Sequence, residues 1–205
     1  MVSSTAARSW AGTTLADRRA ERRRRLLEAG LDLLGTQGAA AVTVRSVCRE
    51  AKLTDRYFYE NFEDRAELLL AVFDGVAGEA ATALVTAAES RHGDLGAMAN
   101  AAVEAFISFL TDDPRKGRVL LVEPLTDLTL GTRGVAIAPM FAQLIQAQVG
   151  KPGSDRDASL TATAMVGALA NLFIRWMDGS QDVTREHLAD YCVRLLLNAS
   201  ALMEE

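Results

Sequence analysis

The sequence predicts an all-α fold in which a three-helix domain with a helix-turn-helix precedes a larger helical domain. Composition is the first reason: the 205 residues include only 4 Pro, and no alternating run of β-branched residues indicates a strand. The second reason is that residues 43–68 fit two short amphipathic helices joined by a tight turn. The third is the series of apolar residues at helical spacing that fills the rest of the chain.

The N-terminal segment is expected to be a disordered arm followed by a basic helix. Residues 1–15 contain no apolar core, so no signal peptide is predicted and the expected location is the cytoplasm. Thr14 to Asp17 can cap a long first helix that includes the run Arg22 to Arg25. Such a run is either a solvated helix face or, as we favour here, a set of phosphate contacts, with Arg24 and Arg25 as candidates.

The stretch TVRSVCREAKLTDRYFYENFEDRAEL, residues 43–68, predicts the helix-turn-helix. Thr43 is a good N-cap for a first short helix, and Thr54 is a good N-cap for a second one that begins at Asp55. Phe58 and Phe62 lie four residues apart and are expected to face inward. The outer side of the second helix is then crowded with Arg, Tyr and polar groups, which is typical of a helix that reads DNA.

Six more helical segments are predicted downstream. Their expected bounds are Asp64 to about Glu89, Gly93 to before Pro114, Arg115 to Glu123, Ala136 to Val149, Asp155 to Asp178, and Thr184 to about Met203. A loop is predicted at Gly131 to Gly134 and a turn at Lys151 to Ser154.

The stretch from Ala158 to Ile174 has no charged residue, but we do not predict that it crosses a membrane. It is short for a span, contains Ser, Thr and Asn, and lacks basic flanks. We therefore expect a helix buried against partner helices, and no membrane partner.

Charge divides the chain into a basic head, residues 16–65, and an acidic body, residues 66–205. The net charge is −5, yet the residues up to Arg65 hold 12 Lys/Arg against 9 acidic residues. This distribution favours a DNA-reading end and a separate module. Cys48 and Cys192 are expected to be buried thiols. Because the sequence has no Gly-rich phosphate loop, G-x-S-x-G motif or metal-ligand cluster, no enzyme, cofactor or metal is expected.

Three short patterns point to one known family. Leu26 to Leu34, which leads to Gly38, is similar to I-L-x-A-A-x-x-L-F followed by glycine, and Thr43 to Cys48 is similar to T-[TV]-x-x-[IV]-A. Leu53 to Leu68 is similar to V-S-x-x-x-[LF]-Y-x-x-F-x-[SDN]-[KR]-x-x-L. With these patterns, roughly residues 22–73 resemble the TetR family of bacterial transcriptional regulators.

The chain departs from the family patterns at four positions. Lys52 takes the turn position where glycine is usual, so it is expected near the left-handed region at a cost of about 1 kcal/mol. Ser46 replaces an acidic residue, and a weaker capping box with Thr43 is expected. Arg65 replaces a lysine, and Asn61 replaces an aromatic residue or His.

The resemblance implies phosphate contacts from Thr43, Arg45, Tyr59 and Arg65. Arg56 is the best candidate for reading a base, because a guanidinium pairs with O6 and N7 of guanine. Tyr57 is expected to contact thymine methyls or phosphate, with packing of Tyr57 and Tyr59 on the first helix as the alternative. The DNA-contact candidates are Arg24, Arg25, Thr43, Arg45, Thr54, Asp55, Arg56, Tyr57, Tyr59, Asn61 and Arg65.

The resemblance also implies that residues 66–205 form a helical ligand-binding and dimerisation domain. A stripe of aromatic residues there either lines a small-molecule pocket or is plain core, which is the more common case. Polar side chains can meet a ligand, although Arg175 alternatively pairs with Glu123 or Asp190. The pocket candidates are Phe106, Phe109, Glu123, Met140, Phe141, Leu144, Asn171, Phe173 and Arg175.

The last two helices, rich in small and apolar residues, suggest a four-helix interface between two copies, with an intramolecular core as the alternative. The interface candidates are Leu160, Ala164, Gly167, Ala168, Leu188, Tyr191, Leu195 and Ala199. The expected function is a homodimeric regulator, with repression favoured over activation, that binds a palindromic double-stranded DNA operator and is released by a small-molecule effector. The alternative is a helical protein that sequesters a small molecule and carries a degenerate DNA-binding head.

Overall fold

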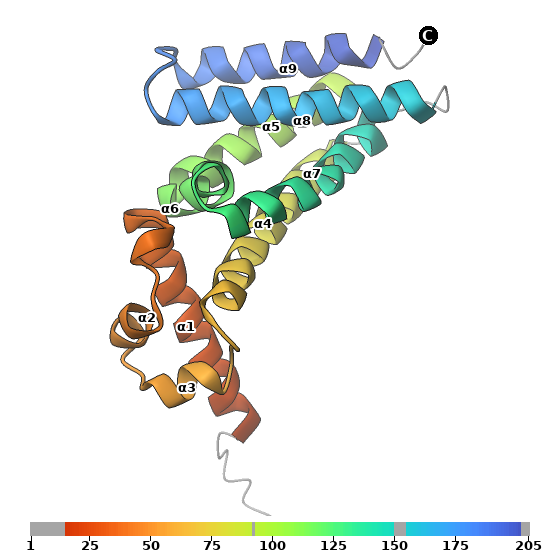
Figure 1. Ribbon diagram of the computed structural model, residues 1–205. Coiled ribbons are helices and arrows are strands. Elements are labelled where there is room, and N and C mark those ends of the chain that lie inside the picture. The colour runs from red at the N-terminus through yellow and green to blue at the C-terminus, as the bar shows by residue number, and fades with distance from the viewer. Residues whose placement is uncertain (1–14, 92, 150–154, 202–205) are drawn as a thin grey trace, which may run out of the picture.

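The computed structural model describes residues 15–91, 93–149 and 155–201, and within those ranges it contains helices and no strand. The head holds α1 (Leu15–Gln37), the 3₁₀ helix η1 (Ala39–Ala41), α2 (Val44–Ala51) and α3 (Asp55–Tyr59). The helix α4 (Arg65–Glu89) runs from the head into the body, where α8 (Asp155–Met177) and α9 (Arg185–Ala201) lie side by side at the far end (Figure 1). The expected disordered arm, apart from Leu15, and the turn at Lys151 to Ser154 lie outside the described residues.

Side-chain caps begin two of the long helices, and the sequence predicts the one at Asp64. The Asp64 carboxylate accepts the Glu67 N–H at 2.9 Å at the start of α4. The Asp94 carboxylate accepts the Ala97 N–H at 3.0 Å at the start of α5 (Leu95–Asp112). Each bond satisfies a backbone donor that has no partner within its own helix.

The middle of the chain differs from the prediction in two places. The expected helix at Arg115 to Glu123 is divided into α6 (Pro114–Gly117), the π-helical η2 (Arg118–Val122) and the 3₁₀ helix η3 (Glu123–Leu125). The prediction of a loop at Gly131 to Gly134 is wrong, because both glycines lie within α7 (Leu128–Val149).

Packing explains why the glycines of α7 do not break it. A Cβ on Gly131 would lie 2.8 Å from the Pro124 carbonyl oxygen, so a glycine permits this close approach of α7 to η3. Leu130, its neighbour, is fully buried. Tertiary contacts therefore override the weak helix propensity of glycine.

Two main clusters form the core. The first is continuous from the head into the lower body, because it includes Leu26, Val47 and Phe58 together with Leu69 and Phe73 of α4. Phe58 and Phe62 are both buried, as predicted. The second cluster joins α5, α8 and α9 through Ile107, Phe173 and Cys192, among others. The predicted boundary at residue 65 therefore coincides with the start of α4 but not with a gap in packing.

Both cysteines are free and buried, which confirms the prediction of separate thiols. Burial raises the pKa of the Cys192 thiol to about 11. The pKa of Cys48 is also raised to about 11, first by burial and then by the hydrogen bond with Asp55. Both groups are therefore protonated at neutral pH and are poor nucleophiles.

Three helical segments within the described residues are long and apolar enough to cross a membrane on length and composition alone. They are Arg65–Glu89, Leu128–Gln146 and Arg156–Met177. The first packs against α5, α7 and α1, and the third packs against α7 and α9. The third leaves most of its residues only partly covered in a single chain, so the burial against partner helices that we expected at Ala158 to Ile174 is only partial within one chain.

Glu123 connects the body to the head. Its carboxylate is 2% exposed and accepts the Ala39 N–H at 2.9 Å and the Arg118 Nε–H at 2.8 Å. Arg118 also donates to the Thr36 carbonyl at 3.3 Å. The segment after α6 is therefore hydrogen-bonded to the end of α1 and the start of η1.

We predict that Glu123→Gln lowers the free energy of unfolding by about 1–3 kcal/mol, because a buried N–H or the guanidinium loses its acceptor. Urea denaturation followed by circular dichroism measures the change. Glu79→Gln is the matched control: Glu79 pairs with Lys116 but its side chain is 59% exposed, so less than about 0.5 kcal/mol is expected. Equal effects of the two substitutions would contradict the role of Glu123.

Candidate DNA-binding surface and ligand cavity

Thr43 and Ser46 fix the start of α2. The Thr43 hydroxyl accepts the Ser46 N–H at 3.0 Å, and the Ser46 hydroxyl accepts the Thr43 N–H at 2.9 Å. The reciprocal bond that we expected to be weakened is therefore formed at an ordinary length. The Ser46 hydroxyl also donates to the Ala41 carbonyl at 2.7 Å, which anchors α2 to η1.

Lys52 forms the turn between α2 and α3. Its φ of 53° and ψ of 46° place it in the left-handed region, as predicted, and it is the one non-glycine residue with positive φ among the described residues. The Lys52 N–H bonds to the Arg49 carbonyl and the Leu53 N–H bonds to the Cys48 carbonyl. The turn thus closes with the usual bonds of a left-handed helix end, at the cost of placing a Cβ there.

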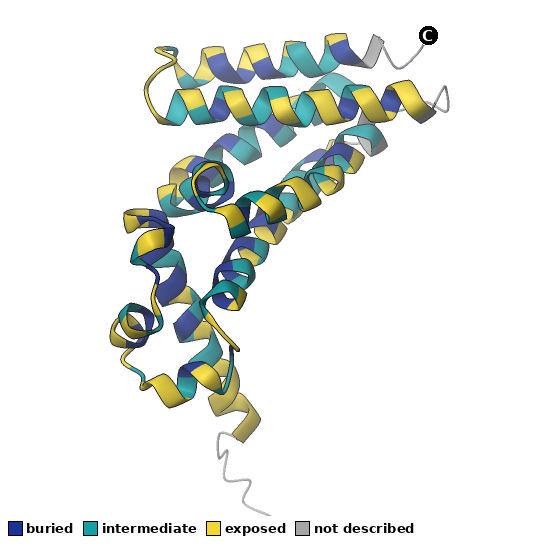
Figure 2. Ribbon diagram, in the orientation of Figure 1, coloured by how far each residue is buried: buried dark blue, intermediate teal, exposed yellow. Residues whose placement is uncertain are grey.

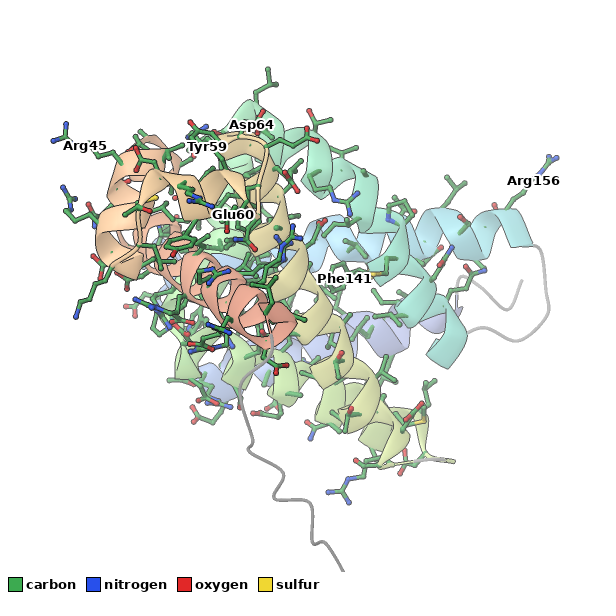
Figure 3. All side chains as sticks on the ribbon, turned by 90° about the horizontal axis from the view of Figure 1, so that it is seen from below. Arg45, Tyr59, Glu60, Asp64, Phe141 and Arg156 are labelled. Atoms are coloured by element: carbon green, nitrogen blue, oxygen red, sulfur yellow. The ribbon has the colours of Figure 1, made fainter. Side chains whose placement is uncertain are left out.

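The outer side of α3 and the start of α2 form one exposed surface. Arg56 has a side chain that is 84% exposed, with its Nε 3.0 Å from the Glu60 carboxylate. Tyr59 is 61% exposed, and Arg45 extends away from the ribbon in the view from below the head (Figure 3). The predicted contact residues that are exposed are Arg24, Thr43, Arg45, Thr54, Asp55, Arg56 and Tyr59.

Four predicted contact residues have partners inside the protein instead. The ring of Tyr57 lies under the Arg22 guanidinium at 4.5 Å, which is the packing on the first helix that we kept as an alternative. The Asn61 side chain donates to the Tyr57 carbonyl at 2.7 Å. Arg65 donates to the carbonyls of Val42 and Ala39, each at 2.6 Å.

Arg25 is the fourth of these, and it belongs to a wider pattern. Its guanidinium donates to the carbonyls of Ala51 and Lys52 at the end of α2. Arg19 and Arg23 donate to the carbonyls of Glu60 and Asn61, just after α3. Most of the basic run therefore faces the helix-turn-helix rather than solvent, which single-sequence reasoning missed because a charge run gives no sign of its tertiary partners.

The body contains a partly open cavity of about 580 Å³ between α4, α5, α7, α8 and α9. Four of the residues proposed for a ligand pocket line it, namely Phe106, Phe141, Leu144 and Phe173, and Phe141 is labelled in Figure 3. Sequence reasoning missed Phe73, Leu84 and Val85 of α4 and Met98 of α5. The apolar face of the helix that connects head and body is the sequence feature from which the α4 residues could have been predicted.

Five predicted pocket residues do not line the cavity. Glu123 faces the head and pairs with Arg118, so its suggested pairing with Arg175 is wrong. Asn171 and Arg175 lie on the exposed face of α8, and Met140 is 37% exposed on α7. Phe109 stacks on Phe106 with ring centres 6.3 Å apart. Helical spacing placed these residues on helices correctly but not on the face that borders the cavity.

The predicted interface residues divide between the surface and the core. Leu160, Ala164, Gly167 and Tyr191 are exposed, and Ala168 and Leu195 are half-buried. Exposed positions recur along both α8 and α9 (Figure 2). Leu188 and Ala199 are buried within the chain itself, so their assignment to an interface is a misplacement. The reason is that α9 turns this face toward α5, with which it shares a core cluster.

Comparisons with known proteins agree on the class of this molecule. Residues 26–72 match the family model of bacterial regulatory proteins of the tetR family. The fold is similar to that of a tetR-family transcriptional regulator from Streptomyces coelicolor, with a TM-score of 0.70, 18% identity, and coverage of 90% of this chain and 81% of that one.

Two further solved structures share the fold. The regulator FadR from Bacillus subtilis, solved in complex with stearoyl-CoA, has a TM-score of 0.69 at 15% identity and covers 86% of this chain and 98% of its own. A TetR-like regulator from Rhodococcus sp. RHA1 has a TM-score of 0.65 at 20% identity, with coverage of 89% and 97%.

The match of the helix-turn-helix region to this family model supports a DNA-binding regulator of transcription. More narrowly, residues 26–72 match the family model of tetR-family bacterial regulatory proteins, and 89–90% of the chain is similar in fold to solved TetR family transcriptional regulators.

We predict that Lys52→Gly raises the free energy of unfolding by up to about 1 kcal/mol, because glycine removes the Cβ from the left-handed turn. The free protein is compared with wild type by thermal melting. Arg49→Gly, in the last turn of α2, is the control and should be destabilising by about 1 kcal/mol. A loss of stability in Lys52→Gly would show that the lysine side chain makes a compensating contact.

Proposed function

We propose that this protein is a homodimeric repressor whose heads read a palindromic DNA operator and which a small molecule in the body cavity releases. The observation that carries the proposal is that one helix, α4, belongs to both sites. Its first residues join the helix-turn-helix, and its later residues Leu84 and Val85 line the cavity. The two parts correspond to residues 16–65 and 66–205.

The exposed surface of the head is suited to a major groove. Arg56 projects from α3 and can give two hydrogen bonds to guanine, while Arg45, Thr43 and Tyr59 are also exposed on the head and can contact phosphate. The salt bridge between Arg56 and Glu60 is solvent-exposed, so breaking it when Arg56 binds a base costs little free energy. Arg25, Tyr57, Asn61 and Arg65 are better explained as residues that shape this surface.

The dimer is supported by the unpaired face of α8. Leu160 is 69% exposed and lies in line with Ala164 and Gly167, whose small side chains permit close helix packing. Tyr191 of α9 is also exposed, at 45%. Two copies joined there place two heads on one duplex, where half-sites one turn apart are roughly 34 Å from each other.

Release by a ligand is a shift between two arrangements of the body. A molecule that binds better when α4 is displaced favours that arrangement and lowers the affinity of the heads for the operator. Relatives of the same fold include a FadR solved with stearoyl-CoA and a multidrug binding protein, EbrR, solved with imidazole. These complexes support a ligand site in this fold class.

We predict that selection of duplexes from a random library at near-physiological salt yields a palindromic consensus. Arg56→Ala should relax specificity at one position in each half-site and cost about 1–3 kcal/mol in binding, because a bidentate contact is lost. The matched control is Arg91→Ala, an exposed arginine of the body that should leave the consensus unchanged.

A consensus that stays unchanged in Arg56→Ala would remove this arginine from base reading. If wild type selects no consensus, the operator-binding proposal fails, and the sequestering protein with a degenerate head becomes the better explanation.

A further inference from the structure

The cavity of the body has an almost completely apolar lining. Among the described residues that line it, Thr163 has the one polar side chain, and its hydroxyl donates to the Ser159 carbonyl of its own helix at 2.8 Å. Within the described part of the chain, no charged side chain borders the space. The polar residues that the sequence suggested for a ligand pocket, Glu123, Asn171 and Arg175, do not line this cavity.

We propose that the ligand of this cavity presents a hydrocarbon moiety to it, and that any charged group of the ligand stays outside. This deepens the proposed function, because it names the chemistry of the effector. A buried charge or hydrogen-bonding group would lose its water and find no partner in this lining. Apolar surface, in contrast, is favourably removed from water against residues such as Phe73, Met98 and Phe141.

The volume is sufficient for a molecule of ordinary ligand size. About 580 Å³ lies within the range of roughly 300–1,000 Å³ that is typical of small-molecule sites. The lining combines aromatic rings from four helices with aliphatic side chains from α4, α5 and α9. Such a surface selects for hydrophobic area and not for a pattern of hydrogen bonds.

A homologous series of straight-chain primary alcohols tests the proposal. We predict that the affinity of the purified full-length protein, measured by calorimetry without DNA, rises roughly fourfold for each added methylene until the cavity is filled, which corresponds to about 0.8 kcal/mol per methylene. Fatty acids of matched chain length, at pH 8, distinguish two sources of the hydrocarbon. If the fatty acids bind as tightly as the alcohols, the natural ligand is an amphiphile whose head group stays outside the cavity. If the fatty acids bind more weakly, the natural ligand is a neutral hydrophobic molecule.

Ala102→Phe locates the site, because Ala102 lines the cavity and a phenyl group would occupy part of it. It should abolish the dependence of affinity on chain length for the longer alcohols. Ala136→Phe, on the exposed face of α7 and outside this lining, is the matched control. The chain-length series on wild type remains decisive if Ala102→Phe does not fold.

Affinity that does not rise with chain length would overturn the proposal, as would binding that Ala102→Phe leaves unchanged. Operator affinity is measured separately in the presence of the tightest alcohol. If the alcohols bind but the operator affinity stays the same, release by ligand fails while the assigned ligand chemistry stands.

A second inference concerns the basic run of α1. Helix C-termini leave carbonyls without partners and carry partial negative charge, so a guanidinium is a favourable cap there. Arg25 caps the end of α2, and Arg19 and Arg23 cap the chain just after α3, with distances of 2.7 and 3.1 Å to the carbonyls of Glu60 and Asn61. The helix α3 has only five residues, too few to be stable alone.

We infer that these arginines are positioning residues that hold the recognition helix, and are not phosphate contacts. Arg24 differs from its neighbours: its guanidinium faces solvent and bonds the Glu21 carboxylate at 2.7 and 2.9 Å. The same run therefore supplies both the capping residues and a comparison residue of the same type.

Operator binding as a function of salt separates the two roles, given the proposed function. Arg25→Gln should lower the melting temperature and the operator affinity while the slope of log K against log salt stays at the wild-type value. Loss of a phosphate contact would instead reduce that slope by about 0.9. Arg24→Gln, the comparison variant, should leave the melting temperature unchanged.

A reduced slope in Arg25→Gln, or an unchanged affinity, would overturn the positioning role. Melting of the free protein reports on the caps without DNA. An absence of operator binding by wild type would therefore count against the proposed function and not against the caps.

Discussion

The carboxylate of Glu123 is the interaction on which the arrangement of head and body depends. It is almost completely buried, and its two bonds join η1 of the head to Arg118 of the body. A buried carboxylate without partners is strongly unfavourable, so the groups that satisfy it have to stay together. The same short segment contributes Leu120, Leu121 and Pro124 to the cavity. The wall of the cavity and the entry to the helix-turn-helix are thus parts of one hydrogen-bonded unit.

The basic residues of the head are divided between two tasks. Those of α1 that face inward hold the carbonyl ends of α2 and α3, and Arg65 holds the carbonyls of η1 and the chain after it. Those on the outer side, above all Arg45 and Arg56, remain available to a nucleic acid. The net positive charge of the head therefore does not give the number of its phosphate contacts. The inward group instead ties the very short helices α2 and α3 to α1.

Apolar residues in the body serve three different surfaces. One set closes the core between α5, α8 and α9, another lines the cavity, and a third remains on the outside of α8, where Leu160 is largely exposed. Burial of apolar area is non-directional, so the residue types alone do not separate these sets. For this reason the sequence does not distinguish Phe106, which borders the cavity, from Phe109, which lies three residues later on α5 and does not.

The sequence by itself determined the helical class, the caps at Thr43 and Asp64, the left-handed turn at Lys52 and the buried pair Phe58 and Phe62. These features depend on local rules, namely capping by short polar side chains, backbone sterics and the period of the helix. The family patterns in the head are local for the same reason.

Only the tertiary structure decided what each side chain contacts. The continuity of α7 through Gly131, the inward turn of Arg25 and the bonds of Glu123 to Ala39 and Arg118 all depend on residues far away in the chain. Periodicity assigns a residue to a face of its helix, but the partner of that face is set by how the helices pack.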